Sequence, residues 1–80
     1  MTLLDLGENE ITKIPNEIGE LRKLQRLYLD ENPISYVSPS IQNLINLEYL
    51  SIDHDMRITS SISLLPKTVE VDMPIDTSFT

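Results

Sequence analysis

Aliphatic residues recur along the chain at one fixed spacing, as at Leu4, Leu27 and Leu50. Nearly every apolar position of one unit is refilled by an aliphatic residue in the next unit. The matching pairs include Ile11 and Ile34, Ile14 and Val37, Ile18 and Ile41, and Leu21 and Leu44. A fixed period of about 20 to 50 residues is the signature of a repeat architecture. The pattern predicts one stack of three units and a partial fourth, with no second domain.

Each unit changes its own period partway along. Leu27 and Leu29 alternate with polar residues as in a strand, so their side chains share one face. Asn32 marks a turn, and Pro33 prevents a helix from starting there. The apolar positions that follow have helical spacing but are too few and too broken for a regular helix, which favours short 3₁₀ segments. The alternating run 69–73 predicts a fourth, shortened strand.

An asparagine follows the strand positions in two units, at Asn9 and Asn32. A tight turn at the end of each strand leaves backbone N–H and C=O groups unpaired inside the stack. A buried asparagine side chain can both donate and accept, so it can satisfy them. We therefore expect Asn9 and Asn32 to form a structural ladder. Asp55, at the same place in the third unit, only accepts when ionised, and it lies beside an insertion at 54–57, so the ladder is expected to end there.

The residues Leu24-x-x-Leu27-x-Leu29-x-x-Asn32-x-Ile34 resemble the signature of leucine-rich repeat proteins, and segment 1–11 repeats the match. Segment 14–21 is similar to the 23-residue subclass found in Ras-pathway scaffold-like proteins and in bacterial leucine-rich repeat proteins. The resemblance implies an α/β solenoid. Its expected form is a right-handed arc with a short parallel concave sheet and mostly 3₁₀ or irregular convex segments.

The resemblance covers residues 1–73, which we expect to form the repeat domain, and leaves 74–80 as a polar C-terminal tail. Family members usually shield the first repeat with a polar cap, whereas Met1 here falls directly in a leucine position. The chain is then expected to be a fragment, or to have its exposed N-terminal edge covered by another molecule. A homo-oligomer formed through this uncapped edge is one such possibility.

Composition narrows the classes of function. Thirteen acidic residues against six basic ones give the 80-residue chain a net charge of −7, which argues against nucleic acid and anionic membrane surfaces as partners. The absence of cysteine excludes disulfides and Cys-based zinc sites. No apolar run approaches the roughly 20 residues of a membrane span, and no signal peptide is visible. We expect a cytoplasmic protein.

Two constellations could carry chemistry. His54 between Asp53 and Asp55 could hold a metal ion or act as a base, but it is the sole histidine, and a solvated turn accounts for it better. Asp30 and Asp53, expected roughly 5 Å apart on adjacent strands, have the carboxyl spacing of retaining glycosidases. Without a pocket, mutual repulsion on a ligand-ready surface is the better account. Neither a nucleophile motif nor a phosphate-binding loop is present. We expect no enzyme, metal or cofactor.

The residues that the repeat places on the concave face combine tyrosine with carboxylates, a composition typical of interaction surfaces. The predicted partner-binding residues are Arg26, Tyr28, Asp30, Glu31, Tyr49, Ser51, Asp53 and His54. A protein partner with a basic patch is expected, its Lys or Arg side chains stacking on a tyrosine ring and pairing with a carboxylate. The alternative is a structural or self-associating repeat fragment that stacks on copies of itself or on missing repeats.

Overall fold

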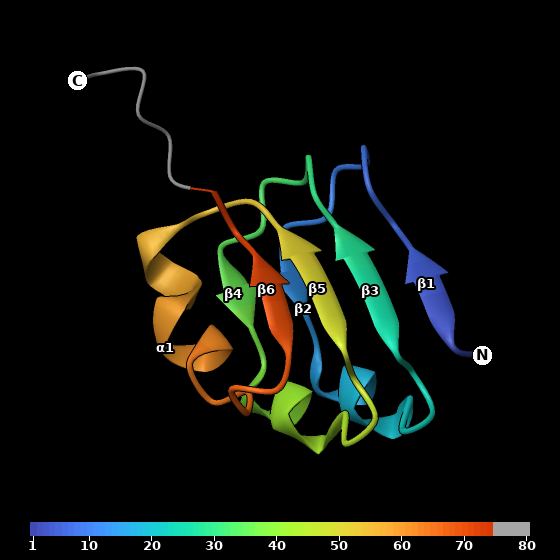
Figure 1. Ribbon diagram of the computed structural model, residues 1–80. Helices are drawn as coiled ribbons and strands as arrows, with labels where there is room; N and C mark the ends of the chain where they lie inside the picture. Colours follow the sequence, from blue (N-terminus) through green and yellow to red (C-terminus); the bar gives the residue numbers. More distant parts are fainter. Residues whose placement is uncertain (75–80) are drawn as a thin grey trace.

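Four short parallel strands line one side of the computed structural model, which describes residues 1–74 (Figure 1). In their order across the sheet, the strands are β1 (Leu3–Asp5), β3 (Arg26–Leu29), β5 (Tyr49–Ile52) and β6 (Glu70–Asp72). The sheet confirms the strand positions predicted from the alternating residues, including the shortened fourth strand. Most of the expected polar tail, residues 75–80, lies outside the described residues.

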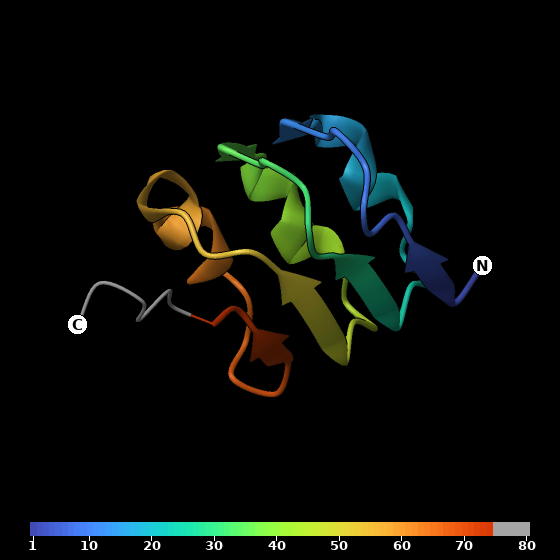
Figure 2. The same cartoon turned by 90° about the horizontal axis from the view of Figure 1, so that it is seen from above.

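Short helices carry the chain back between strands, on the side of the stack away from this sheet (Figure 2). Three of them are 3₁₀ helices, namely η1 (Asn16–Glu20), η2 (Pro39–Asn43) and η3 (Met56–Ile58). The fourth is a single α-helical turn, α1 (Thr59–Ile62). The structure thus confirms short 3₁₀ segments where the broken helical spacing predicts them.

A second, two-stranded parallel sheet precedes these helices and was not predicted. It pairs β2 (Lys13–Ile14) with β4 (Tyr36–Val37). The N–H of Ser38 extends the pairing by donating to the carbonyl of Ile14 at 2.9 Å. Apolar residues three positions apart are compatible with a helical turn or with extended backbone. Ile14 and Val37 reach the core from extended backbone.

The register of the main sheet follows the sequence repeat. Leu3 pairs with Arg26, and Arg26 pairs with Tyr49, so each of these steps across the sheet is one full repeat. Tyr49 then pairs with Glu70, which is a shorter step along the sequence. The third unit is therefore shorter overall than the other two, despite the insertion predicted at 54–57. The register stacks Leu4, Leu27 and Leu50 in one row.

The aliphatic residues of successive units form one continuous core between the strands and the helices. The side chains with the least exposure are Leu24, Leu27, Leu29, Ile41, Leu50, Ile52 and Ile58. In a repeat architecture each unit packs against its neighbours, and stacking joins their aliphatic residues into one core. Burial of the column is therefore cooperative across the repeats.

The first two 3₁₀ helices approach each other closely. A Cβ added at Gly19 in η1 would lie 2.9 Å from the carbonyl oxygen of Ser40 in η2, so only glycine fits without displacement. Buried Ser38 bonds to the side chain of Asn16, and the hydroxyl of Ser40 donates to the carbonyl of Asn16 at 2.8 Å. These contacts give the helical side of the stack its own polar links between repeats.

Asn32 makes the polar link that the sequence predicts at the other end of the unit. Its buried side chain accepts from the N–H groups of Asn9 and Ile11, both at 3.1 Å. Its amide nitrogen donates to the carbonyls of Leu6 at 2.8 Å and Leu29 at 3.0 Å. One side chain thus satisfies backbone groups from two successive units, as expected for a ladder residue.

Asn9 and Asp55 do not continue this ladder as full rungs. Asn9 is exposed, and its amide nitrogen donates only to carbonyls of its own turn, those of Leu6 and Gly7. The prediction that Asn9 is a buried ladder residue is therefore wrong for the described stack. Asn32 bonds to its own unit and to the preceding one, whereas the bonds of the Asn9 side chain stay within its own turn in the described residues.

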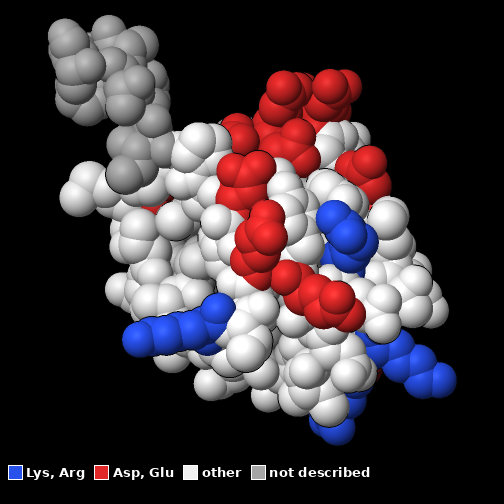
Figure 3. Space-filling model, viewed as in Figure 1, with Lys and Arg blue, Asp and Glu red and all other residues white. Residues whose placement is uncertain are grey.

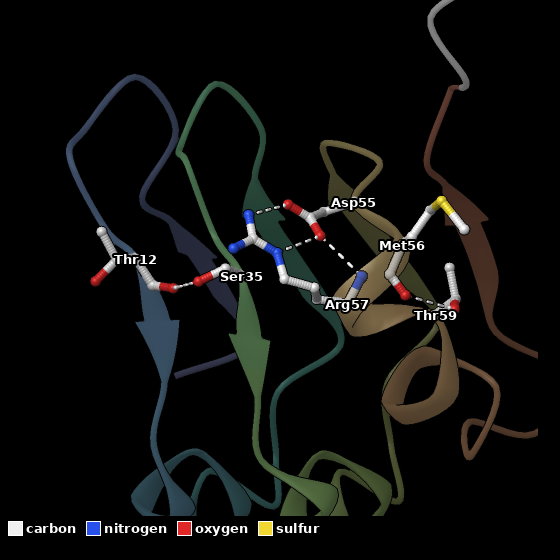
Figure 4. Close-up of polar contacts among 6 residues, drawn as sticks. All are labelled: Thr12, Ser35, Asp55, Met56, Arg57 and Thr59. Carbon is white, nitrogen blue, oxygen red and sulfur yellow. Dashed lines mark hydrogen bonds and ion pairs between the residues drawn. The ribbon is translucent and has the colours of Figure 1, made fainter.

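Asp55 instead caps η3 (Figure 4). One oxygen of its carboxylate accepts from the backbone N–H of Arg57 at 2.8 Å, and the two oxygens receive the Arg57 guanidinium at 3.0 and 2.8 Å. The hydrogen bond from the Arg57 side chain, helped by the one from its backbone N–H, lowers the pKa of Asp55 to about 2. The third unit ends its strand in a capped helix rather than a ladder turn.

Replacing Asn32 with alanine is expected to destabilise the fold severely. Each buried backbone group left unpaired costs about 1–3 kcal/mol, and Asn32 serves several. The matched control is Asn9→Ala, which is exposed and is expected to cost about 0.5 kcal/mol or less. Urea titration of both variants measures the two free energies of unfolding. Equal stability of Asn32→Ala and the wild type would contradict the buried-ladder account.

Candidate partner-binding surface

The side of the main sheet facing away from the helices, here called the open face, displays alternate strand residues. These are Leu3, Asp5, Arg26, Tyr28, Tyr49, Ser51, Glu70 and Asp72. The paired strands arrange them in two rows, so that Arg26 lies between Leu3 and Tyr49, and Tyr28 lies between Asp5 and Ser51. The register therefore makes Tyr28 and Tyr49 diagonal neighbours.

The two tyrosines form an aromatic pair at the centre of the open face. Their ring centroids lie 5.4 Å apart, with the ring planes tilted by 49°. This separation is in the range in which aromatic rings attract beyond simple burial. Both residues are half-buried, so part of each tyrosine stays open to solvent. The pair provides a preformed apolar patch on an otherwise polar surface.

Arg26 covers both rings, a contact that the repeat pattern does not predict. The central carbon of its guanidinium lies 5.1 Å from the ring centroid of Tyr49 and 6.0 Å from that of Tyr28. Its Nε donates to the hydroxyl of Tyr28 at 3.0 Å, and this hydrogen bond is the main cause of a raised pKa for Arg26. The chain therefore supplies its own cation to the rings, in the position expected for a partner's Lys or Arg.

Asp72 completes the cluster from the neighbouring strand. The hydroxyl of Tyr49 donates to a carboxylate oxygen of Asp72 at 3.1 Å. Desolvation raises the pKa of the Tyr49 phenol, and the bond to Asp72 raises it further because the neutral phenol is the donor. Asp72 was not among the predicted site residues. The shortened step from β5 to β6 hides it from a search at the regular spacing.

Ser51 is predicted as a partner-binding residue, but its side chain is buried in the structure. It is only 7% exposed and lies between the columns of larger side chains as the floor of the face. A small residue at this register lets Tyr28 and Asp72 stand beside each other across it. Ser51 therefore shapes the open face, whereas Tyr28 and Tyr49 present area to a partner.

Acidic residues gather where the strands end, in a group we call the acidic rim, made of Glu8, Asp30, Glu31 and Asp53. Figure 3 shows acidic side chains as a band across the sheet that widens at this end, with most basic side chains at the opposite end. The charge of Glu8 is the largest cause of a raised pKa for Glu31, followed by desolvation and the charge of Asp30. The rim is thus a site of repulsion centred on Glu31, which is not one of the pair Asp30 and Asp53 for which the sequence predicts it.

The backbone of the rim is specifically constrained. Glu8 and Glu31 adopt positive φ angles of 58° and 60°, a left-handed conformation that glycine or asparagine adopts more readily. The carboxylate of Asp53 accepts from the N–H of Glu31 at 3.1 Å. Asp53 therefore stabilises the turn of the preceding unit. This structural contact accounts for the position of its carboxylate.

His54 lies half-buried at the start of the third turn, beside Asp53 and Asp55. Asp55 is engaged by Arg57, and Asp53 by the backbone of Glu31. Within residues 1–74, no group of three or more potential metal-binding side chains converges. In the same part of the chain, no helix is long and apolar enough to cross a membrane.

Residues 23–44 match the family model described as Leucine Rich Repeat. The matched segment runs through β3, the Asn32 turn, β4 and η2, and so covers the second unit of the stack. This match identifies the second unit as a leucine-rich repeat, and it supports the resemblance to leucine-rich repeat proteins that the spacing of the leucines and Asn32 predicts. Domains of this family generally mediate protein–protein interactions and are typically non-enzymatic.

Replacing Glu8 with glutamine is expected to lower the pKa of Glu31 toward its ordinary value of 4.5, because it removes the largest cause of the increase. Since the folded pKa of Glu31 is raised, its ionisation destabilises the fold, and stability falls as pH rises from 4.5 through the folded pKa. The variant should lose less stability over that window. Carboxyl-detected NMR titration measures the pKa, and an unchanged value would show that Glu8 does not perturb Glu31.

Proposed function

We propose that this chain is a protein-recognition module that binds its partner on the open face. The observation that carries the proposal is the aromatic pair of Tyr28 and Tyr49, held in place by Arg26. Tyrosine and arginine are enriched among the residues that dominate binding energies at interfaces. Because the chain itself fixes both rings, little side-chain entropy is lost when a partner packs on them.

The acidic rim sets the preferred chemistry of the partner. Glu31 has a raised pKa because neighbouring carboxylates repel its charge, so a partner's Lys or Arg placed there would relieve that repulsion. The rings already have Arg26 as their cation. We therefore assign the partner's basic residues to the rim, with Asp30, Glu31 and Asp53 as their contacts, and its apolar residues to the tyrosine pair. His54 lies beside this rim.

Charge supports the choice of partner class. The net charge of −7 and the rim repel the phosphates of nucleic acids and of anionic membranes, and attract a basic protein surface. The attraction should speed the encounter and make it sensitive to salt. No catalytic step and no cofactor form part of this proposal.

For the architecture, we propose that residues 1–73 form one repeat domain that curves as a right-handed solenoid arc, with the open face on its concave side. The full-repeat steps between the first three paired strands and the helices behind the sheet support this form. A concave sheet would wrap the partner and extend its contact with the acidic rim. The alternative function, self-association, uses a different surface at the N-terminal edge.

The double change Tyr28→Ala with Tyr49→Ala is expected to weaken partner binding by more than about 2 kcal/mol, because it removes both anchors. The partner is first captured from a lysate on the immobilised wild-type chain and identified by mass spectrometry. Its affinity for the wild type and the variant is then measured by calorimetry at low and high salt. Urea titration of the variant establishes that the fold persists.

The matched control is Glu17→Ala with Glu20→Ala, two exposed residues on η1 at the helical side of the stack. This pair is expected to leave partner binding unchanged. Loss of binding in the η1 pair, with binding retained in the tyrosine pair, would place the interaction on the helical side and refute the proposal.

A further inference from the structure

An apolar hollow of about 390 Å³ opens at the end of the stack beyond β1, a surface we call the N-terminal end face. Half-buried Leu6, Ile11 and Leu21 line it, and buried Ile14 and Ile18 form its floor. Adjoining hollows share Leu6 and Ile11 with it on one side and Leu21 on the other. The end of the aliphatic column is therefore accessible across the whole width of the stack.

Strand β1 borders this face with backbone groups directed away from the sheet. The carbonyl of Thr2 and the N–H of Leu6 bond to β3, and strand residues alternate in direction. The N–H and C=O groups of Leu3 and Asp5, between them, consequently point to the open edge. Such an edge beside apolar side chains is a template for pairing with another strand.

Charge divides the N-terminal end face into two halves. Glu8 and Glu10 line the hollow at the end of β1. Near the start of β1, a second hollow is lined by Arg22 and Lys23, with Glu20 beside them. All four of Glu8, Glu10, Arg22 and Lys23 are exposed. The same polarity is visible along the strands in Figure 3. A surface that is acidic at one end and basic at the other is complementary to itself when rotated by half a turn.

We propose that the N-terminal end face pairs two copies of this chain about a two-fold axis, with β1 antiparallel to β1 of the second copy. Centring the axis on Leu4 places Leu3 opposite Asp5 of the second copy. Residues opposite each other at such positions exchange N–H···O=C bonds, and these are the two residues whose groups point outward. The aliphatic ends meet beside the strands, and each acidic half meets the other copy's basic half.

A head-to-tail stack of copies fits these observations less well. It would place β6, with Glu70 and Asp72, beside β1 of the next copy in a parallel arrangement. Asp72 would then lie next to Asp5, and the acidic ends of both copies would meet. The antiparallel pair avoids both repulsions. It also closes on itself, whereas a head-to-tail stack would grow without limit.

The pairing would join two sheets into one and direct both open faces to the same side. A partner with two binding segments could then engage both faces, which raises its apparent affinity without a new contact. This consequence concerns the strength of partner binding. The pairing itself does not depend on the proposed function of the open face.

Analytical ultracentrifugation of the 80-residue chain at about 100 μM and low salt tests the pairing. The wild type is expected to sediment at twice its 9.1 kDa monomer mass. The double change Arg22→Glu with Lys23→Glu, and separately Glu8→Lys with Glu10→Lys, should each weaken the dimer by at least about tenfold. Lys67→Glu, an exposed charge reversal beside β6, is the control and should leave the dimer intact.

Mixing the two charge variants distinguishes the pairing of two N-terminal end faces from a head-to-tail contact. One variant has an end face that is acidic at both ends, and the other an end face that is mainly basic. An antiparallel pair should therefore re-form as a heterodimer in the mixture. A wild-type monomer, a mass that grows steadily with concentration, or a mixture that stays monomeric would each overturn the proposal.

Leu3→Pro tests the backbone contact separately, since it removes an N–H that points to the open edge and leaves the bonds to β3 in place. The variant is expected to be monomeric with an unchanged circular dichroism spectrum. A folded Leu3→Pro variant that still dimerises as tightly as the wild type would show that β1 does not form the interface. If Leu3→Pro unfolds, the charge variants decide the matter alone.

Discussion

The side-chain amide of Asn32 joins the turns of the first and second units, and the register between these two units depends on its bonds. Aliphatic residues pack with little positional preference, so the leucine column alone would tolerate a slip between units. Asn32 accepts from the N–H groups of Asn9 and Ile11 and donates to the carbonyls of Leu6 and Leu29. A slipped unit would bury those groups unpaired, which costs more than the packing could recover.

The open face follows from the register of the paired strands, of which β3 and β5 form the central pair. Because Arg26 pairs with Tyr49, and Tyr28 with Ser51, the two tyrosines must stand as diagonal neighbours with the guanidinium above them. The same turns that hold Asn32 also hold Glu8 and Glu31 at positive φ, which brings acidic side chains together at the strand ends. The acidic rim and the Asn32 bonds therefore belong to the same backbone turns. The helical side is tied separately, through Ser38 and its neighbours.

The spacing of Leu27, Leu29 and Asn32 was sufficient to predict the strands, the 3₁₀ segments and the buried amide, because each follows from a local pattern repeated in sequence. The β2–β4 pairing was missed because spacing alone does not distinguish short extended backbone from a helical turn. The burial of Ser51 and the exposure of Asn9 depend on which units flank them. Arg26 could be placed on the face, but its position above both rings depends on side-chain rotamers, which a repeat pattern does not specify.

Amide hydrogen exchange measured by NMR on the wild-type chain tests the central claim most directly. The N–H groups of Asn9 and Ile11 belong to a turn at the edge of the described stack, yet both donate to the buried oxygen of Asn32. The account predicts that these two amides exchange as slowly as those of the central strand β3, since opening them requires separating the units. Exchange at the rate of an unprotected turn would contradict the claim that Asn32 holds the register.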